Sequence, residues 1–318
     1  MTLSLSRQLF SLLGCPSCIG RPRLKLGESF GKKIFYCGEC KRAYPIRNVK
    51  FQGNLSFETP FLYPFIESFA KDFKETNGEF LNEIIVKEEN PRYCYNAEIA
   101  NNLVLEHLSG KENSLIIDNG CGHKGLQRLI NLRIHGIEYN FGKSAYAPVD
   151  PISPIDFYAN SEYLPLRDGC VDFFISNFVL EHVKQQQLYL NEMYRTLKKD
   201  GEVLISFPTP KWYLAHFISI GTQVGYIKEA LRDKKFYRDP IRYALGKNAH
   251  GWNNNFIEEM TKLWKPERYE KMFINAGFKI ANKSRNGNIF SLYIRYDGLA
   301  RSLKDDKNGI QVSYILKK

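Results

Sequence analysis

A glycine-rich turn directly after a short apolar run constrains this chain more than any other stretch. Residues 115–118 read Leu-Ile-Ile-Asp and continue into Asn-Gly-Cys-Gly-His-Lys-Gly, which ends at Gly125. The apolar run predicts a buried strand. The helix expected from about Leu126 would point its free N–H groups back at the turn. Glycines let the backbone come close to a ligand because they carry no Cβ. The pattern predicts a nucleoside-cofactor site and, taken alone, leaves the cofactor open.

Strand-like and helix-like segments alternate after this turn. Strands are expected at 134–138, 171–177 and 202–207, and an amphipathic helix at about 185–198. Such alternation favours a parallel, doubly wound sheet with its ligands at the carboxyl ends of the strands. Glu138 ends the second strand, 20 residues after Asp118, where a carboxylate can accept from both hydroxyls of an adenosine ribose. An NAD-dependent oxidoreductase would share these features.

Four of the seven cysteines form two pairs near the N-terminus. They are Cys15, Cys18, Cys37 and Cys40, with 18 residues between the pairs. This spacing is typical of a structural zinc site, in which four thiolates leave no coordination position open for water. A segment this short buries little apolar area, so the metal would supply much of its folding free energy. Disulfides are the alternative, and nothing else in the sequence favours secretion.

The second cysteine pair leads into the run Cys-Lys-Arg-Ala-Tyr-Pro-Ile at 40–46. This run resembles the end of the Trm112-like zinc ribbons, and the resemblance covers about residues 9–50. Such ribbons are often attached to methyltransferases or partnered with them. The resemblance therefore raises the expectation of a methyltransferase before the main domain is considered.

The stretch from about 110 to 210 resembles the class I S-adenosylmethionine methyltransferases, in particular the group called methyltransferase type 11. Several ordered motifs carry this resemblance: Asp118 to Gly122, Glu138, Leu164-Pro165, Asp172, Leu180 to Val183, and Lys199-Asp200-Gly201. It implies an α/β fold, a Rossmann-like seven-stranded methyltransferase sheet whose last two strands form an antiparallel pair. Strand-like segments near the end of the chain at 278–282, 290–294 and 312–316 can supply that pair.

The same resemblance implies S-adenosylmethionine as the cofactor. The residues that it assigns to cofactor binding are Asp118, Gly120, Cys121, Gly122, Glu138, Asn160, Ser161 and Asn177. Two positions depart from the family pattern. Lys124 stands where the family often has glycine, and Asn160 stands where it often has an aspartate near the adenine amine. An asparagine can still accept that amine through its carbonyl oxygen.

The sequence divides into an expected zinc ribbon at 1–54 and a methyltransferase domain at 55–318. N-terminal helices are expected within 55–110, because Phe recurs at every fourth position from 57 to 69 and a second apolar pattern covers 96–108. The stretch 208–262 is aromatic and basic, and it predicts a helical insertion that covers the methyl acceptor as a lid. A helical decoration with its own small core is the alternative.

Methyl transfer from a sulfonium depends mainly on positioning and on the exclusion of water. An oxygen acceptor would also profit from a base near its proton. His182 and His250 are the candidates, and no catalytic residue is assigned. For His182 the alternative is a structural role in shaping the cofactor pocket.

The net charge of +11 favours an anionic partner. Residues 1–50 hold ten Lys/Arg against two acidic residues, although solvated surface charge explains this equally well. The predicted acceptor is a small molecule, a sugar or a lipid-linked intermediate, methylated at oxygen or nitrogen. The alternative is RNA docked by the basic ribbon. No apolar run approaches the roughly 18 residues of a membrane span, so we expect a cytoplasmic protein without transmembrane segments. The oligomeric state stays open.

Overall fold

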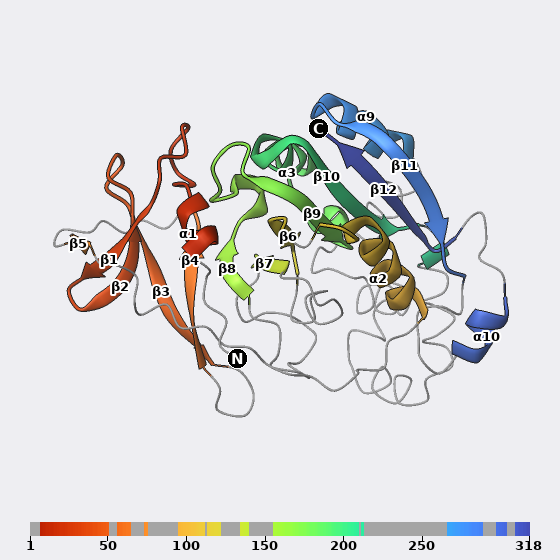
Figure 1. Ribbon diagram of the computed structural model, residues 1–318, viewed down its shortest axis with the longest axis horizontal. Coiled ribbons are helices and arrows are strands. Elements are labelled where there is room, and N and C mark those ends of the chain that lie inside the picture. The colour runs from red at the N-terminus through yellow and green to blue at the C-terminus, as the bar shows by residue number, and fades with distance from the viewer. Residues whose placement is uncertain are drawn as a thin grey trace, which may run out of the picture.

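One twisted sheet runs through the computed structural model from end to end (Figure 1). The structure describes residues 7–50, 56–64, 73–75, 95–111, 113–121, 134–139, 155–209, 211–212, 266–288, 297–303 and 309–318. Within these residues the sheet has 12 strands in the order β11-β12-β10-β9-β6-β7-β8-β4-β3-β2-β1-β5.

The centre of the sheet is parallel. Its strands are β6 (Ile116–Asn119), β7 (Ile134–Glu138), β8 (Ile155–Ala159), β9 (Val171–Asn177) and β10 (Leu197–Pro208). β12 (Gln311–Lys317) runs antiparallel to β10, and β11 (Lys279–Asn286) runs antiparallel to β12. These seven strands confirm the predicted sheet with its closing antiparallel pair. The strand order reverses between β7 and β9 around β6, which is where open α/β sheets place their ligands.

Helices cover both faces of this parallel region, so its strands are apolar on both sides. On one face α2 (Tyr95–Leu108) packs Val104 and Leu108 against β6 and β9. On the other face α3 (Gln186–Thr196) and α9 (Pro266–Asn275) contribute Tyr189, Met193 and Phe273 to the main core. A short helix, α10 (Asp297–Ser302), lies near the end of the chain. Among the described helices, none is long and apolar enough to cross a membrane.

The N-terminal part forms one end of the sheet, drawn in red and orange in Figure 1. We call residues 7–50 the ribbon. It contains α1 (Arg7–Leu12) and three antiparallel strands, β1 (Lys25–Ser29), β2 (Lys32–Tyr36) and β3 (Ala43–Lys50). The short β5 (Phe73–Glu75) adds to β1. The β1–β2 turn consists of Phe30 and Gly31, both with positive φ, as a tight hairpin requires.

The helix predicted around Phe57 and Phe61 is wrong, because residues 56–62 form the strand β4 (Ser56–Leu62). A spacing of four residues fits both a helix face and one side of a strand, and Pro60 lacks the N–H that a helix interior needs. β4 pairs antiparallel with β3 and parallel with β8, so it joins the ribbon to the central sheet. The β3–β4 hairpin therefore straddles the predicted boundary at 54/55. The helix predicted at 96–108 is confirmed by α2.

Several predictions lie outside the described residues. They concern the strand at 290–294, positions 65 and 69 of the phenylalanine pattern, Gly122, Lys124, Gly125, His250, and the insertion at 208–262 apart from residues 208, 209, 211 and 212.

Candidate functional site

The predicted cofactor residues that the structure describes gather at the carboxyl edge of the parallel strands. Asp118 lies in β6, with Gly120 and Cys121 directly after it, and Glu138 ends β7. Asn160 and Ser161 follow β8, and Asn177 ends β9. Parallel strands bring their carboxyl ends to one edge, so residues up to 59 positions apart (118 to 177) share this part of the molecule. Their assignment to cofactor binding stays a prediction.

The turn after β6 leaves room for glycine alone at position 120. Gly120 has a φ of +90°, and a Cβ built there would lie 2.5 Å from the Cγ2 atom of Val179. The N–H groups of Gly120 and Cys121 both donate to the carbonyl oxygen of Ile137, at 2.8 and 3.1 Å. The turn is thus pressed between the end of β7 and the segment that follows β9.

Asn119, which the sequence reasoning missed, connects this turn to the loop after β8. Ser161 Oγ donates to Asn119 Oδ1 at 2.5 Å, and the Asn119 side chain is fully buried. Asn119 Nδ2 and Asn177 Oδ1 are buried without a hydrogen-bond partner in the described structure. Such atoms are costly unless something pairs with them, so both fit contacts with a bound polar ligand. The signal in the sequence was a polar residue at the end of a buried strand.

Asn160 has a structural task besides the predicted one. Its Oδ1 accepts the N–H of Glu162 at 2.9 Å and so caps the short helix η2 (Ser161–Tyr163). A carbonyl oxygen has two lone pairs, so one remains for an adenine amine. Glu162 in turn accepts the N–H of Gln185 at 2.9 Å, which ties the loop to the start of α3.

Negative charge surrounds the turn. Burial raises the pKa of the Cys121 thiol well above its usual range, and the charges of Asp118 and Glu138 raise it further. Cys121 is therefore a neutral thiol and a poor nucleophile, while the field around it suits a cationic ligand. Glu138 Oε1 accepts the N–H of Tyr139 at 2.8 Å. Tyr63, which directly follows β4, donates its hydroxyl to the carbonyl oxygen of Tyr139 at 2.6 Å.

Of the two predicted histidine bases, only His182 lies within the described residues. It ends the short helix η3 (Leu180–His182) just after β9, with its Nε2 3.7 Å from Glu181 Oε1. The Glu181 side chain is 1% exposed and the His182 side chain 29% exposed. This arrangement places an imidazole at the carboxyl edge, and it does not assign a catalytic base.

The four predicted metal ligands meet in the ribbon. The sulfur atoms of Cys15, Cys18, Cys37 and Cys40 all lie within 4.8 Å of one another, and none of them forms a disulfide. Cys15 Sγ lies 3.7 Å from Cys40 Sγ, and Cys18 Sγ lies 3.8 Å from Cys37 Sγ. A tetrahedral ion with metal–sulfur distances of about 2.3 Å requires sulfur–sulfur distances of about 3.8 Å. The four side chains therefore fit a zinc ion.

A polar chain supports one of these ligands. The hydroxyl of Tyr44 lies 3.1 Å from Cys15 Sγ and 2.9 Å from Ser17 Oγ, and Arg42 donates to Ser17 Oγ at 2.7 Å. Ser17 Oγ also lies 2.9 Å from the carbonyl oxygen of Pro64. Tyr44 is the tyrosine of the Tyr-Pro-Ile run, and its position gives that run a physical role, a donor held against a thiolate.

Comparison with known proteins identifies the central domain. A family model described as "Methyltransferase domain" matches residues 117–205. A demethylmenaquinone methyltransferase of Streptomyces avermitilis is 27% identical over 133 residues, which are 41% of this chain and 52% of the relative. The chain thus spans about half the length of that curated relative.

Solved structures give two further likenesses. An S-adenosylmethionine-dependent methyltransferase from Mesorhizobium loti shares 14% identity, with a TM-score of 0.39, over 69% of this chain and 98% of its own. A complex of the Haloferax volcanii Trm112 methyltransferase activator with a methyltransferase shares 13% identity, with a TM-score of 0.38, over 70% of this chain and 95% of its own. Together with the family match and the sheet order, the motifs define a class I S-adenosylmethionine-dependent methyltransferase domain.

Proposed function

We propose that this chain transfers a methyl group from S-adenosylmethionine to an oxygen or nitrogen atom of a small molecule, a sugar or a lipid-linked intermediate. We propose further that its ribbon holds one structural zinc ion. The observation that carries the methyltransferase proposal is the gathering of Asp118, Gly120, Glu138 and Asn177 at the strand-order reversal, inside the segment that matches the methyltransferase domain.

S-adenosylmethionine, when bound, supplies a methyl group that already carries a cationic leaving group. The chain's own residues have to bind the cofactor and the acceptor, orient them for methyl transfer and exclude water. Glu138 would accept from the ribose hydroxyls, and Asp118 would hold an ammonium group. The Gly120 turn brings backbone N–H groups close to a carboxylate. Asn177 Oδ1 and Asn119 Nδ2, both buried without partners in the described structure, would supply an acceptor and a donor.

One relative bears on which class of methyl acceptor to test first. The name of the Streptomyces avermitilis relative gives demethylmenaquinone as that protein's own substrate. At 27% identity over about half of the relative, the name supports testing quinone-like and lipid-linked acceptors first. Transfer of a radioactive methyl group into fractionated extracts would compare the lipid, aqueous small-molecule and RNA fractions directly.

Cofactor binding is tested by calorimetry with S-adenosylhomocysteine on the full chain. We expect binding, and we expect Glu138→Gln to weaken it about tenfold or more, because a hydrogen bond to a charged group contributes about 1.5–3 kcal/mol. Glu106→Gln is the matched control, since Glu106 is an exposed carboxylate on α2. Binding of NAD without binding of S-adenosylhomocysteine would instead support an oxidoreductase.

RNA remains the second candidate because of the charge of the ribbon. Its exposed basic residues include Arg23, Lys25, Lys32, Lys41 and Arg47. Arg42, by contrast, is engaged inside the ribbon. If RNA is the acceptor, affinity for it should fall by roughly 10³-fold or more between 50 and 200 mM salt, as six to ten phosphate contacts require. Lack of RNA binding at low salt would remove this candidate.

A further inference from the structure

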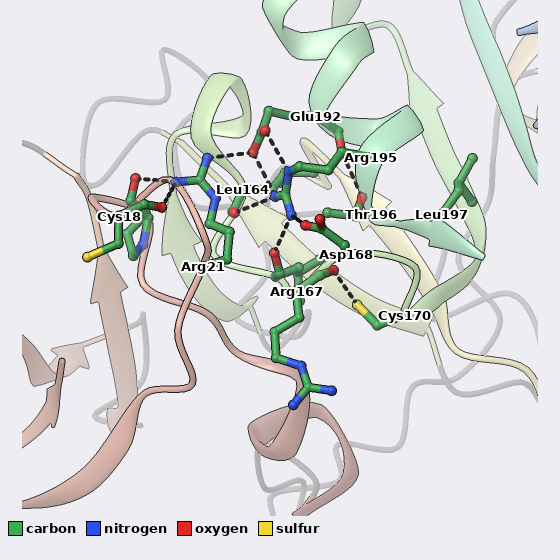
Figure 2. Close-up of polar contacts among 12 residues, drawn as sticks. Cys18, Arg21, Leu164, Arg167, Asp168, Cys170, Glu192, Arg195, Thr196 and Leu197 are labelled. Carbon is green, nitrogen blue, oxygen red and sulfur yellow. Dashed lines mark hydrogen bonds and ion pairs between the residues drawn. The ribbon is translucent and has the colours of Figure 1, made fainter. Parts of the chain in front are cut away.

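One largely buried side chain of the ribbon, that of Arg21, reaches across to the central domain. Arg21 follows the first cysteine pair, with a φ of 45°. Its Nη1 donates to the carbonyl oxygens of Pro16 at 2.7 Å and Cys18 at 3.1 Å, and its Nη2 donates to Glu192 Oε2 at 3.0 Å (Figure 2). The Arg21 and Glu192 side chains are 10% and 9% exposed. One guanidinium thus holds the backbone around the cysteine cluster and a carboxylate on α3.

Glu192 passes this contact on to a second arginine. Arg195 donates to Glu192 Oε1 at 2.8 Å and to Glu192 Oε2 at 2.9 Å. It also donates to the carbonyl oxygens of Leu166 at 2.9 Å and Leu164 at 3.2 Å, and it pairs with Asp168 at 2.5 Å (Figure 2). The chain of contacts therefore runs from the cysteine cluster, through α3, to residues 164–168.

Residues 160–168 form one continuous segment after β8, which we call the clamped loop. Its first residues, Asn160 and Ser161, are the candidate adenine contacts, and Ser161 holds Asn119. Its last residues are held by Arg195 and by the ribbon backbone. Gly14 N donates to the Pro165 oxygen at 3.0 Å, and Arg167 N donates to the Leu12 oxygen at 3.0 Å. Hydrogen bonds from the ribbon and from α3 thus hold one end of the clamped loop, and its other end lies at the candidate cofactor site.

The contact of Arg21 with Glu192 depends on the conformation of the turn that carries Cys15 and Cys18. Arg21 can reach Glu192 and the carbonyls of Pro16 and Cys18 together only while these carbonyls keep their places. Two of the four sulfur atoms, those of Cys15 and Cys18, come from the same turn. An ion held by four sulfurs would fix this turn, whereas four thiols without an ion would lose that restraint.

We propose that Arg21 is a positioning residue that couples the metal cluster to the cofactor site through Glu192 and Arg195, so that metal in the ribbon raises affinity for the cofactor. The coupling rests on the proposed function for its cofactor. Coupling between two sites is reciprocal, so a bound cofactor must raise the affinity of the ribbon for its metal by the same factor. A brace that merely stabilises the fold would leave both affinities unlinked.

The test compares Arg21→Met with Arg23→Met, both measured as full chains with their zinc content. Arg23 is an exposed neighbour whose guanidinium lies 5.9 Å from the Phe10 ring, so it matches the substitution without the Glu192 contact. We expect Arg21→Met to keep one zinc per chain and to bind S-adenosylhomocysteine about tenfold more weakly, within the usual range of coupling. Arg23→Met should bind normally. Arg21→Lys should recover part of the affinity, because an ammonium can keep the charge but not the fork.

Two further measurements separate coupling from loss of structure. Amide exchange in the clamped loop should quicken in Arg21→Met while the exchange of β9 and β10 stays unchanged. In an equilibrium competition, a chelator should remove less zinc from the wild type when S-adenosylhomocysteine is present, and this protection should vanish in Arg21→Met. Should Arg21→Met not fold, Glu192→Gln removes the ion pair with Arg21, together with that of Arg195, with little change of shape.

The outcomes also separate this inference from the proposed function. A wild type that does not bind S-adenosylhomocysteine contradicts the proposed function. In that case the coupling is tested by amide exchange alone. Equal amide exchange rates in the clamped loop with and without zinc would overturn it. Normal cofactor affinity in zinc-loaded Arg21→Met overturns the coupling and leaves the proposed function intact.

Discussion

The cysteine cluster and the carboxyl edge of the parallel strands are two small sites built in opposite ways. The cluster takes its four side chains from two short turns, and their sulfur atoms come within 4.8 Å of one another. The carboxyl edge takes its residues from the ends of β6, β7, β8 and β9, which only the sheet brings together. The cluster depends on one proposed ion, whereas the edge depends on many hydrogen bonds and packed side chains.

Because the two sites are built differently, the loss of one side chain should affect them differently. Removal of one ligand or of the ion should loosen both cysteine turns at once, since all four sulfur atoms would bind the same ion. Removal of one contact at the carboxyl edge should weaken the site in proportion to that contact, because the strands continue to hold the others. The clamped loop takes part in both regions, because the ribbon backbone holds one end of it and Ser161 at the other end bonds to Asn119.

The largest effect is expected from Cys18→Ser, which removes one of four thiolates. We expect zinc content to fall from one per chain to none, because apparent binding free energies of about 10–16 kcal/mol for structural zinc depend on the full ligand set. Amide protection in the two cysteine turns should fall while that of β9 and β10 persists. Cys170→Ser is the control: this buried thiol outside the cluster donates to the Arg167 oxygen at 3.0 Å, as a serine can. Retention of zinc by Cys18→Ser would contradict the four-ligand site.

A smaller effect is expected from Gly120→Ala, which tests the carboxyl edge where it is most crowded. The added Cβ would meet Val179 at 2.5 Å in a backbone with φ of +90°, so we expect a loss of about 1–3 kcal/mol in the free energy of unfolding. Binding of S-adenosylhomocysteine should weaken along with it. Gly38→Ala has nothing within 4 Å of its Cβ and should change neither quantity.

A second variant separates the two causes of the Gly120→Ala effect. Val179→Ala combined with Gly120→Ala removes the contacts with the Val179 Cγ2 and Cγ1 atoms at 2.5 and 2.7 Å, and it leaves the Cβ of residue 179 at 3.2 Å and the positive φ. It should therefore recover only part of the stability. Full recovery would mean that the backbone conformation costs nothing, and no effect of Gly120→Ala at all would show that the turn tolerates a side chain.

The two regions also differ in how far the sequence predicts them. The cysteine spacing was sufficient for the cluster because its geometry is local. The bounds of β7 and β9 agree with the predicted strands at 134–138 and 171–177, since apolar runs there end at polar residues. Contacts between distant segments could not be predicted. Arg21 and Glu192 are 171 positions apart, and the pairing of β4 with β8 was hidden by a phenylalanine spacing that fits helix and strand alike.

The smallest effect is expected from Ser161→Ala, which removes the single 2.5 Å hydrogen bond between the clamped loop and Asn119. A net loss of about 1 kcal/mol in stability is expected, and S-adenosylhomocysteine affinity should fall by about two- to tenfold. Ser302→Ala, on the exposed surface of α10, is the control, and Ser161→Thr should behave like the wild type because it keeps the hydroxyl.

The double variant Ser161→Ala with Asn119→Leu makes the pair apolar, so stability should recover, since replacing both partners is nearly neutral. If Asn119 Nδ2 serves the cofactor, affinity stays low in that variant although stability returns. Recovery of both would reduce Asn119 to a structural residue and leave the carboxyl edge with one fewer contact to the ligand.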